Sequence, residues 1–190
     1  MSDAGAKAVV IGASAGAVQA LSRILPSLPA EYPLPVLVVV HVPADPSGLV
    51  ALFGGKCAAR VRDPDDKEPI VGGTIYFAPS GYHMLVEEDG SIALSIDEPV
   101  LYSRPAIDIL FQSAADVYGD GLVGVVLTGA NEDGAEGAAA IVAAGGRVLV
   151  EEPELAFAAT MPEAALARCP AARALPLDAI ADYLVRLEEP

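Results

Sequence analysis

A serine, a histidine and an aspartate are each tied to a strongly apolar run of this 190-residue chain. Ser14 is the centre of "GASAG" at residues 12–16, which fits the pattern Gly-x-Ser-x-Gly. His41 closes the run "PVLVVVHV", and Asp133 lies in the loop after "GLVGVVLTG". A serine nucleophile, an imidazole base and a carboxylate that orients the imidazole are the parts of a hydrolytic triad.

The glycine turn around Ser14 has a second interpretation, a dinucleotide-binding loop. That fingerprint is Gly-x-Gly-x-x-Gly, and its second glycine lets the backbone approach a pyrophosphate. Alignment on Gly12 puts Ser14 at the second glycine and Ala17 at the third, and His41 stands where a ribose-binding acid is needed. These departures favour a nucleophile over a nucleotide site, although Gly-x-Ser-x-Gly alone also fits a serine that caps a helix.

The loop after the third apolar run offers two acids, Glu132 and Asp133. We predict that Asp133 orients His41, with Glu132 as its rival, while each acid also fits a helix cap or a solvated loop. A right-handed crossover would bring His41 to the same sheet edge as Ser14. No histidine follows Asp133, which excludes the α/β-hydrolases, because their chain order is Ser, Asp, His.

The elements that must position these residues alternate between strand and helix signals. Buried strands are expected within residues 35–42, 121–131 and 147–152, which are rich in β-branched residues. Helices are expected within residues 105–119, 133–146 and 177–189. We predict a three-layer, Rossmann-like α/β fold, doubly wound around a mostly parallel sheet, in which ligands bind at the carboxyl ends of the strands.

The middle of the chain departs from this alternation. Residues 83–96 form two alternating runs joined at Asp89-Gly90, which predicts a hairpin with a type I′ turn. Such a hairpin would be an antiparallel appendage to the parallel core.

Composition excludes several classes of partner. The formal net charge of −15 argues against nucleic acid and against an anionic membrane surface. The longest apolar run, residues 34–42, is far shorter than the roughly 20 residues that span a bilayer. The N-terminus has no signal-peptide pattern, so we expect a cytoplasmic protein without membrane insertion.

The sequence also predicts no metal and no cofactor. Cys57 and Cys169 lie far apart without a CxxC, and the chain has only two histidines, so a zinc site is not expected. The acidic run at residues 63–69 lacks the glycine and terminal glutamate of a calcium loop and is interpreted as a solvated turn.

Six stretches, in the same order, resemble the catalytic domain of the CheB family of chemotaxis protein-glutamate methylesterases. They are "VIGASAG", "PVLVVVHVP", "GGTIYFAPSGYHMLVE", "SRPAIDILFQSAA", "GVVLTGANEDGAEG" and "MPEAAL". The resemblance implies Ser14 as nucleophile, His41 as base and Asp133 as its partner. It also implies hydrolysis of glutamyl γ-methyl esters, and deamidation of certain glutamines, on the cytoplasmic helices of methylated chemoreceptors.

Departures from the family pattern concern the neighbours of these residues. Ala15 stands where the family often has Thr, and Ala130 precedes Asn131 where many members have Gly-Met-Gly before the aspartate. We expect the backbone N–H groups of Ala15 and Ala130 to be the oxyanion donors, which a side-chain change need not remove. Arg104 keeps the family's arginine position and is a candidate substrate contact.

We expect residues 1–190 to be one methylesterase-type catalytic domain without the receiver domain that regulated relatives carry. Control would then come from localisation or from a separate response regulator or other signalling protein. Two alternatives remain: a non-catalytic module of the same fold that binds receptors or a signalling partner, and a nucleotide-binding α/β protein.

Overall fold

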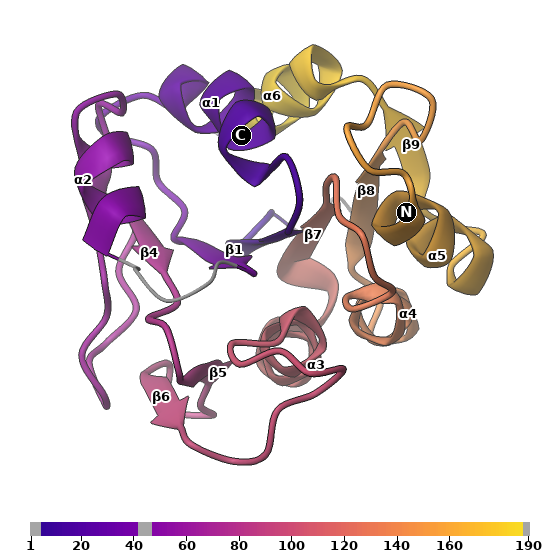
Figure 1. The fold of residues 1–190 in the computed structure, drawn as a ribbon. Coiled ribbons are helices and arrows are strands. Elements are labelled where there is room, and N and C mark those ends of the chain that lie inside the picture. The colour runs from indigo at the N-terminus through magenta and orange to yellow at the C-terminus, as the bar shows by residue number, and fades with distance from the viewer. Residues whose placement is uncertain (1–4, 42–46, 188–190) are drawn as a thin grey trace.

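A seven-stranded parallel sheet is the centre of the computed structural model, which describes residues 5–41 and 47–187 (Figure 1). Its strand order is β3-β4-β2-β1-β7-β8-β9. The strands are β1 (Ala8–Ala13), β2 (Val36–Val40), β3 (Arg60–Arg62), β4 (Thr74–Phe77), β7 (Leu122–Val126), β8 (Arg147–Glu151) and β9 (Arg173–Leu175). The strands that follow β1 in the chain, β2 to β4, lie on one side of it, and β7 to β9 lie on the other, so the topological switch point is at β1.

Helices cover both faces of the sheet (Figure 1). On one face lie α1 (Ala17–Ile24), α2 (Ser47–Gly54) and α6 (Leu177–Arg186), with a short 3-10 turn, η1 (Leu25–Ser27), after α1. On the other lie α3 (Ile107–Tyr118), α4 (Ala135–Ala143) and α5 (Thr160–Arg168), with η2 (Gly119–Gly121) after α3. The predicted three-layer, doubly wound α/β fold is confirmed.

Strand β1 shows why the apolar runs carry no polar alternation. Val9 and Ile11 pack into the core beneath α1 and α6, whereas Ala8 and Val10 pack into the core beneath α3 and α4. Successive side chains of a strand point to opposite faces, and here both faces are covered. An apolar residue is therefore needed at every position.

The hairpin of β5 (His83–Val86) and β6 (Ile92–Ser95) forms a separate antiparallel sheet against α3, as predicted. The predicted type I′ turn is wrong. Val86 pairs with Ile92, which leaves a five-residue connection, and the Gly90 N–H bonds to the Glu87 carbonyl. Gly90 has φ 80°, but Asp89 does not have the positive φ that a type I′ turn requires, so the loop is a type I turn closed by a glycine bulge.

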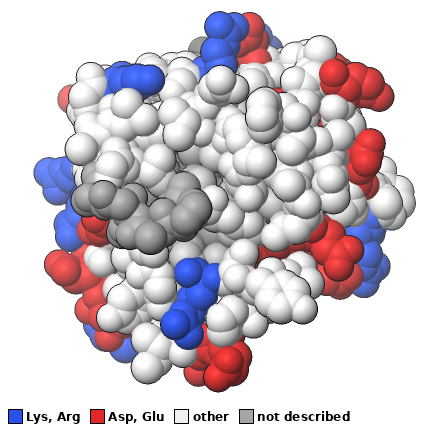
Figure 2. All heavy atoms as spheres, in the orientation of Figure 1, with Lys and Arg blue, Asp and Glu red and all other residues white. Residues whose placement is uncertain are grey.

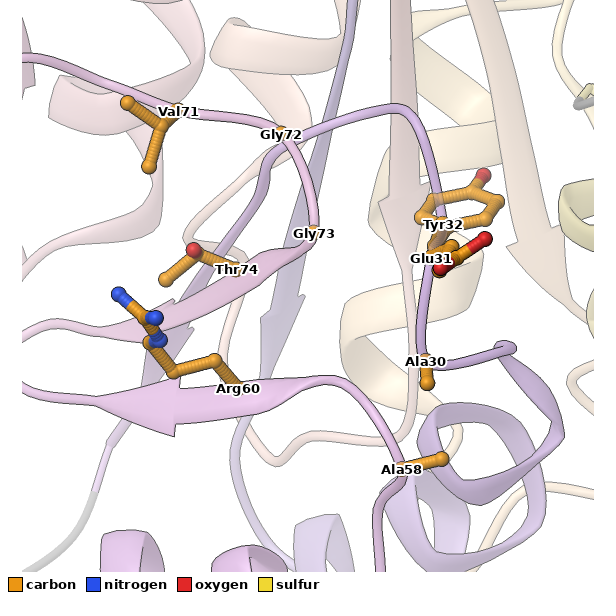
Figure 3. A pocket seen from close by; sticks show the side chains of 9 residues that line it. All are labelled: Ala30, Glu31, Tyr32, Ala58, Arg60, Val71, Gly72, Gly73 and Thr74. Carbon is orange, nitrogen blue, oxygen red and sulfur yellow. The ribbon is translucent and has the colours of Figure 1, made fainter.

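A hollow of about 590 Å³ lies at the amino ends of β3 and β4. In Figure 3, Glu31 and Tyr32 lie across it from Arg60 and Thr74. It is lined by Ala30, Glu31, Tyr32, Ala58, Arg60, Val71, Gly72, Gly73 and Thr74. Ser14, His41 and Asp133 belong instead to the carboxyl ends of β1, β2 and β7, so this hollow is not the site that the sequence predicts.

Candidate active site

The serine of the candidate site sits in a tight turn between β1 and α1. Ala17 N–H donates to the Ser14 carbonyl at 2.9 Å, and Gly16 has φ 83° and ψ 6°. Ala15 has no positive φ, so the turn is of type II, in which the third residue is in the left-handed region that favours glycine. The turn leaves Ser14 half-buried at the end of a fully buried strand.

Gly16 is required for a second reason, because a Cβ built on it would lie 2.7 Å from the Cβ of Phe157. We expect Gly16→Ala to lower the free energy of unfolding by about 1–3 kcal/mol, the usual cost of forcing a non-glycine residue into such a conformation. Urea denaturation measures this change. Gly54→Ala is the matched control: nothing lies within 4 Å of its Cβ and its φ is ordinary, so little change or a small gain is expected. Equal losses in the two variants would contradict this account of the turn.

Strand register places His41 beside Ser14. Ala13 pairs with Val40 in the parallel β1–β2 ladder, and His41 N–H donates to the Ala13 carbonyl at 3.1 Å. The next pair in this register is Ser14 and His41. On the other side, Ser14 N–H donates to the Thr128 carbonyl at 2.9 Å, so Ser14 lies between the ends of β2 and β7.

The imidazole of His41 is hydrogen-bonded to Asp133. The distance from His41 Nε2 to Asp133 Oδ2 is 2.7 Å, and the side chains are 10% and 0% exposed. Glu132, the rival acid, is exposed. Ser14 Oγ makes no hydrogen bond to His41 or to any other described residue, a looseness common in active sites without substrate.

Asp133 is held by the first turn of α3. Its Oδ2 accepts the Ile107 N–H at 2.6 Å and its Oδ1 accepts the Asp108 N–H at 2.9 Å. A carboxylate only accepts, so His41 Nε2 carries the proton of the 2.7 Å bond. The nitrogen left for Ser14 is therefore Nδ1, the reverse of the arrangement in which Nδ1 faces the acid.

The backbone around Ser14 offers two free donors. The N–H groups of Ala15 and Ala130 bond to nothing among the described residues, whereas those of Ser14, Thr128 and Gly129 are all used. Gly129 N–H donates to the Ala158 carbonyl at 3.0 Å. The two N–H groups expected to stabilise an oxyanion are thus free to do so.

Arg104 lies in the loop before α3 and ties this loop to the hairpin. Its Nη1 donates to the carbonyls of Ile96 and Asp97 at 3.0 and 3.1 Å, and its buried Nε makes no hydrogen bond within the described chain. These hydrogen bonds give Arg104 a structural role, and among the described residues no hydrogen bond or ion pair joins it to Ser14, His41 or Asp133.

Sequence reasoning missed two buried acids close to these residues. Glu151, 2% exposed, ends β8 and accepts the Thr128 N–H at 2.8 Å, and burial raises the pKa of its carboxyl. Asp108, 7% exposed, lies in the first turn of α3; burial, and next the charge of Asp133, raise its pKa to about 6. A signal existed for Glu151, since an acid directly after "RVLV" continues a buried strand. Asp108 looks like an ordinary solvent-facing acid at a helix start.

Thr128 connects the serine turn to the neighbouring loops. Its Oγ1 donates to the Ala15 carbonyl at 2.7 Å and accepts the Ala158 N–H at 2.8 Å. With its backbone bonds to Ser14 and Glu151, Thr128 fixes the turn against β7, β8 and the loop that carries Phe157. The serine is therefore held on a rigid scaffold.

The surface near the site carries exposed apolar side chains. Phe157 is 74% exposed beside Gly16, and Tyr102 is fully exposed in the loop before α3. Leu101, next to Tyr102, and Glu132 line a cavity of about 570 Å³ between this loop, α4 and α5. On the face in Figure 2, charged side chains lie mainly along the margin and most of the middle is uncharged.

No helix in the described part of the chain is both long and apolar enough to cross a bilayer. Among the same residues, no cluster of three His, Cys, Asp or Glu side chains is placed to hold a metal ion.

Both the sequence and the fold of this chain are similar to those of known proteins. The family model described as CheB methylesterase matches residues 9–184. A protein of Leptospira interrogans is 40% identical over 184 residues, which cover 96% of this chain and 95% of that protein. The "Protein-glutamate methylesterase/protein-glutamine glutaminase" of Symbiobacterium thermophilum is 40% identical over 179 residues, and the match spans 94% of this chain but about half (49%) of that protein.

The fold is also similar to that of a solved structure. The crystal structure of the Thermotoga maritima CheB methylesterase catalytic domain superposes with a TM-score of 0.91 and 31% sequence identity. The match covers 96% of this chain and 98% of the solved chain.

Proposed function

This chain belongs to the CheB methylesterase family, and from that membership we propose that it is a serine hydrolase that demethylates glutamyl γ-methyl esters of chemoreceptor cytoplasmic helices. Deamidation of receptor glutamines, the second activity in the relatives' name, is proposed for the same site. The observation that carries the proposal is the 2.7 Å hydrogen bond from His41 to the buried Asp133, in register beside Ser14.

In the proposed reaction, Ser14 Oγ attacks the ester carbonyl carbon while Nδ1 of His41 takes its proton. Asp133 stabilises the imidazolium through Nε2. His41 then gives the proton to the methoxy oxygen, and methanol leaves an acyl-enzyme on Ser14. A water molecule attacks this ester, His41 accepts its proton and returns it to Ser14 Oγ, and the glutamate is released.

The negative oxygen of each tetrahedral intermediate needs donors that are already in place. The free N–H groups of Ala15 and Ala130 are proposed for this role. Ala15 directly follows the nucleophile and precedes Gly16, the N-cap of α1, so it lies near the helix end where the dipole favours negative charge. Neither donor depends on a side chain, which is why alanine is tolerated at both positions.

Methanol release from a synthetic peptide that carries a glutamyl γ-methyl ester tests this function directly. We expect the purified chain to release methanol and leave glutamate, which mass spectrometry detects, and the glutamine peptide to release ammonia. A methanol rate no higher than that of buffer would favour the non-catalytic binding module. A thermal shift with a nicotinamide or adenine nucleotide would instead point to the nucleotide-binding alternative.

A further inference from the structure

Asp133, the partner of His41, lies close to a second buried acid, Asp108, that the proposed mechanism does not use. Asp133 is 0% and Asp108 is 7% exposed. Placing two acids side by side in a protein interior costs free energy, because burial and mutual repulsion both oppose their ionisation. Hydrogen bonds to the second acid must therefore offset part of this cost.

The two acids link α3 to α4, which lie side by side in Figure 1, by accepting hydrogen bonds from backbone N–H groups. Asp133, just before α4, accepts the Ile107 and Asp108 N–H groups of α3 at 2.6 and 2.9 Å. Asp108, in the first turn of α3, accepts the Gly134 and Gly137 N–H groups of α4 at 3.0 and 2.7 Å. Asp133 thus caps α3 and Asp108 caps α4, and the donated N–H groups stabilise the negative charge of both carboxylates.

Two glycines of the α4 region allow α3 and α4 to approach closely enough for these hydrogen bonds. A Cβ on Gly137 would lie 2.5 Å from the Cβ of Phe111 and 3.2 Å from Asp108 Cα, so any larger residue would push α4 away from α3. Gly134 has φ 99°, which turns the chain directly after Asp133. The distance between the two helices, and with it the position of Asp133, is fixed by these contacts.

We infer that Asp108 is a positioning residue for the proposed hydrolysis: it fixes the carboxylate of Asp133 against His41, and its negative charge strengthens His41 as a base. The inference rests on the proposed function. The positioning effect and the charge effect of Asp108 can be tested separately. The positioning part needs only the oxygen Oδ1, which accepts both α4 donors, whereas the second part needs the charge.

Other charged groups surround Asp108 and must be counted in its effect. Asp133 and Glu132 face it from the loop before α4, Glu136 from the first turn of α4, and Arg168 from the end of α5. Glu136 is bound to Arg168 at 2.7 Å and is largely exposed, so this pair acts weakly through solvent. Because the pKa of Asp108 is raised to about 6, the group is charged at pH 8 and loses its charge as the pH falls through about 6.

Asp108→Asn retains Oδ1 and removes the charge. We expect the acid limb of the pH profile of kcat/KM to move to lower pH by about half a unit, and kcat to fall about threefold at pH 8, since a weaker base accepts the serine proton less well. Asp108→Ala also loses the acceptor, so we expect kcat to fall roughly tenfold or more with KM little changed. Glu136→Gln, the matched control at the start of α4, is expected to leave both the profile and kcat unchanged.

Stability should change in the opposite direction to activity. The folded state binds the Asp108 proton more tightly than the unfolded chain, so ionisation of Asp108 costs stability as pH rises through about 6, and this cost is absent below about 4. Asp108→Asn should therefore melt a few degrees higher than wild type at pH 8, with the difference disappearing near pH 4. If Asp108 were only structural, Asp108→Asn would raise the melting temperature at pH 8 without lowering kcat.

An unchanged pH profile in Asp108→Asn, or an unchanged kcat in Asp108→Ala, would overturn the corresponding part of the inference. Nuclear magnetic resonance supplies a readout that needs no turnover: the pH at which the His41 ring resonance titrates should move lower in Asp108→Asn and stay in place in Glu136→Gln. If the wild type hydrolyses no ester, the proposed function fails while this titration still tests Asp108. If the wild type is active and neither readout moves, only the inference on Asp108 fails.

Discussion

Replacing Ser14 with alanine is expected to lower ester hydrolysis by at least about a thousandfold and to abolish labelling by a fluorophosphonate. Ser14 Oγ is the only proposed atom that forms a bond to the substrate, so its loss leaves only the slow reaction of water in a polarising site. Steady-state methanol release and mass spectrometry of the labelled protein measure the two effects. Melting of the variant should be close to that of wild type, because Ser14 Oγ bonds to no described residue.

Ser22→Ala is the matched control for this experiment. Ser22 lies on α1, the helix that follows the turn, and Lys56 Nζ donates to its Oγ at 3.2 Å in an exposed position. Hydrolysis and labelling should be unchanged. Modification of a serine other than Ser14, together with an active Ser14→Ala variant, would refute the assignment of the nucleophile.

Asp133→Asn should reduce kcat by about a thousandfold or more, the scale of wrong-tautomer substitutions in hydrolytic triads. Both oxygens of Asp133 accept hydrogen bonds, from His41 and from two backbone N–H groups. An amide has one acceptor oxygen, so at least one of these three donors would face an NH₂ group. Kinetics with the peptide ester measure kcat, and circular dichroism checks that the variant is folded.

Glu132→Gln is the control that the chain itself offers, since Glu132 is adjacent in sequence but exposed. We expect its kcat to stay within about tenfold of wild type. The reverse ranking, a large loss in Glu132→Gln and a small one in Asp133→Asn, would move the acid of the proposed triad by one residue.

The sequence by itself determined the fold class and the sheet edge at which the candidate site lies. Apolar runs without polar alternation, such as the one at β1, require two covered faces, and alternation with helical segments requires parallel strands. The predicted type I′ turn of the hairpin was wrong, because Asp89-Gly90 is only a local signal. The pairing of Val86 with Ile92 fixes the length of the connection. Local chemistry therefore predicted elements and their ends but not the register between them.

Only the tertiary structure decided which acid meets His41 and what surrounds it. Glu132 and Asp133 are neighbours with similar chemistry, and the choice depends on the N-terminus of α3, which begins 26 residues before Asp133 and supplies the donors that draw one carboxylate inward. Asp108 looks solvated in the sequence and is buried because α4 packs over it at Gly137. Hydrogen bonds between segments so distant in the chain leave no periodic pattern, since each depends on the distance and angle between two helices rather than on the spacing of residues along one.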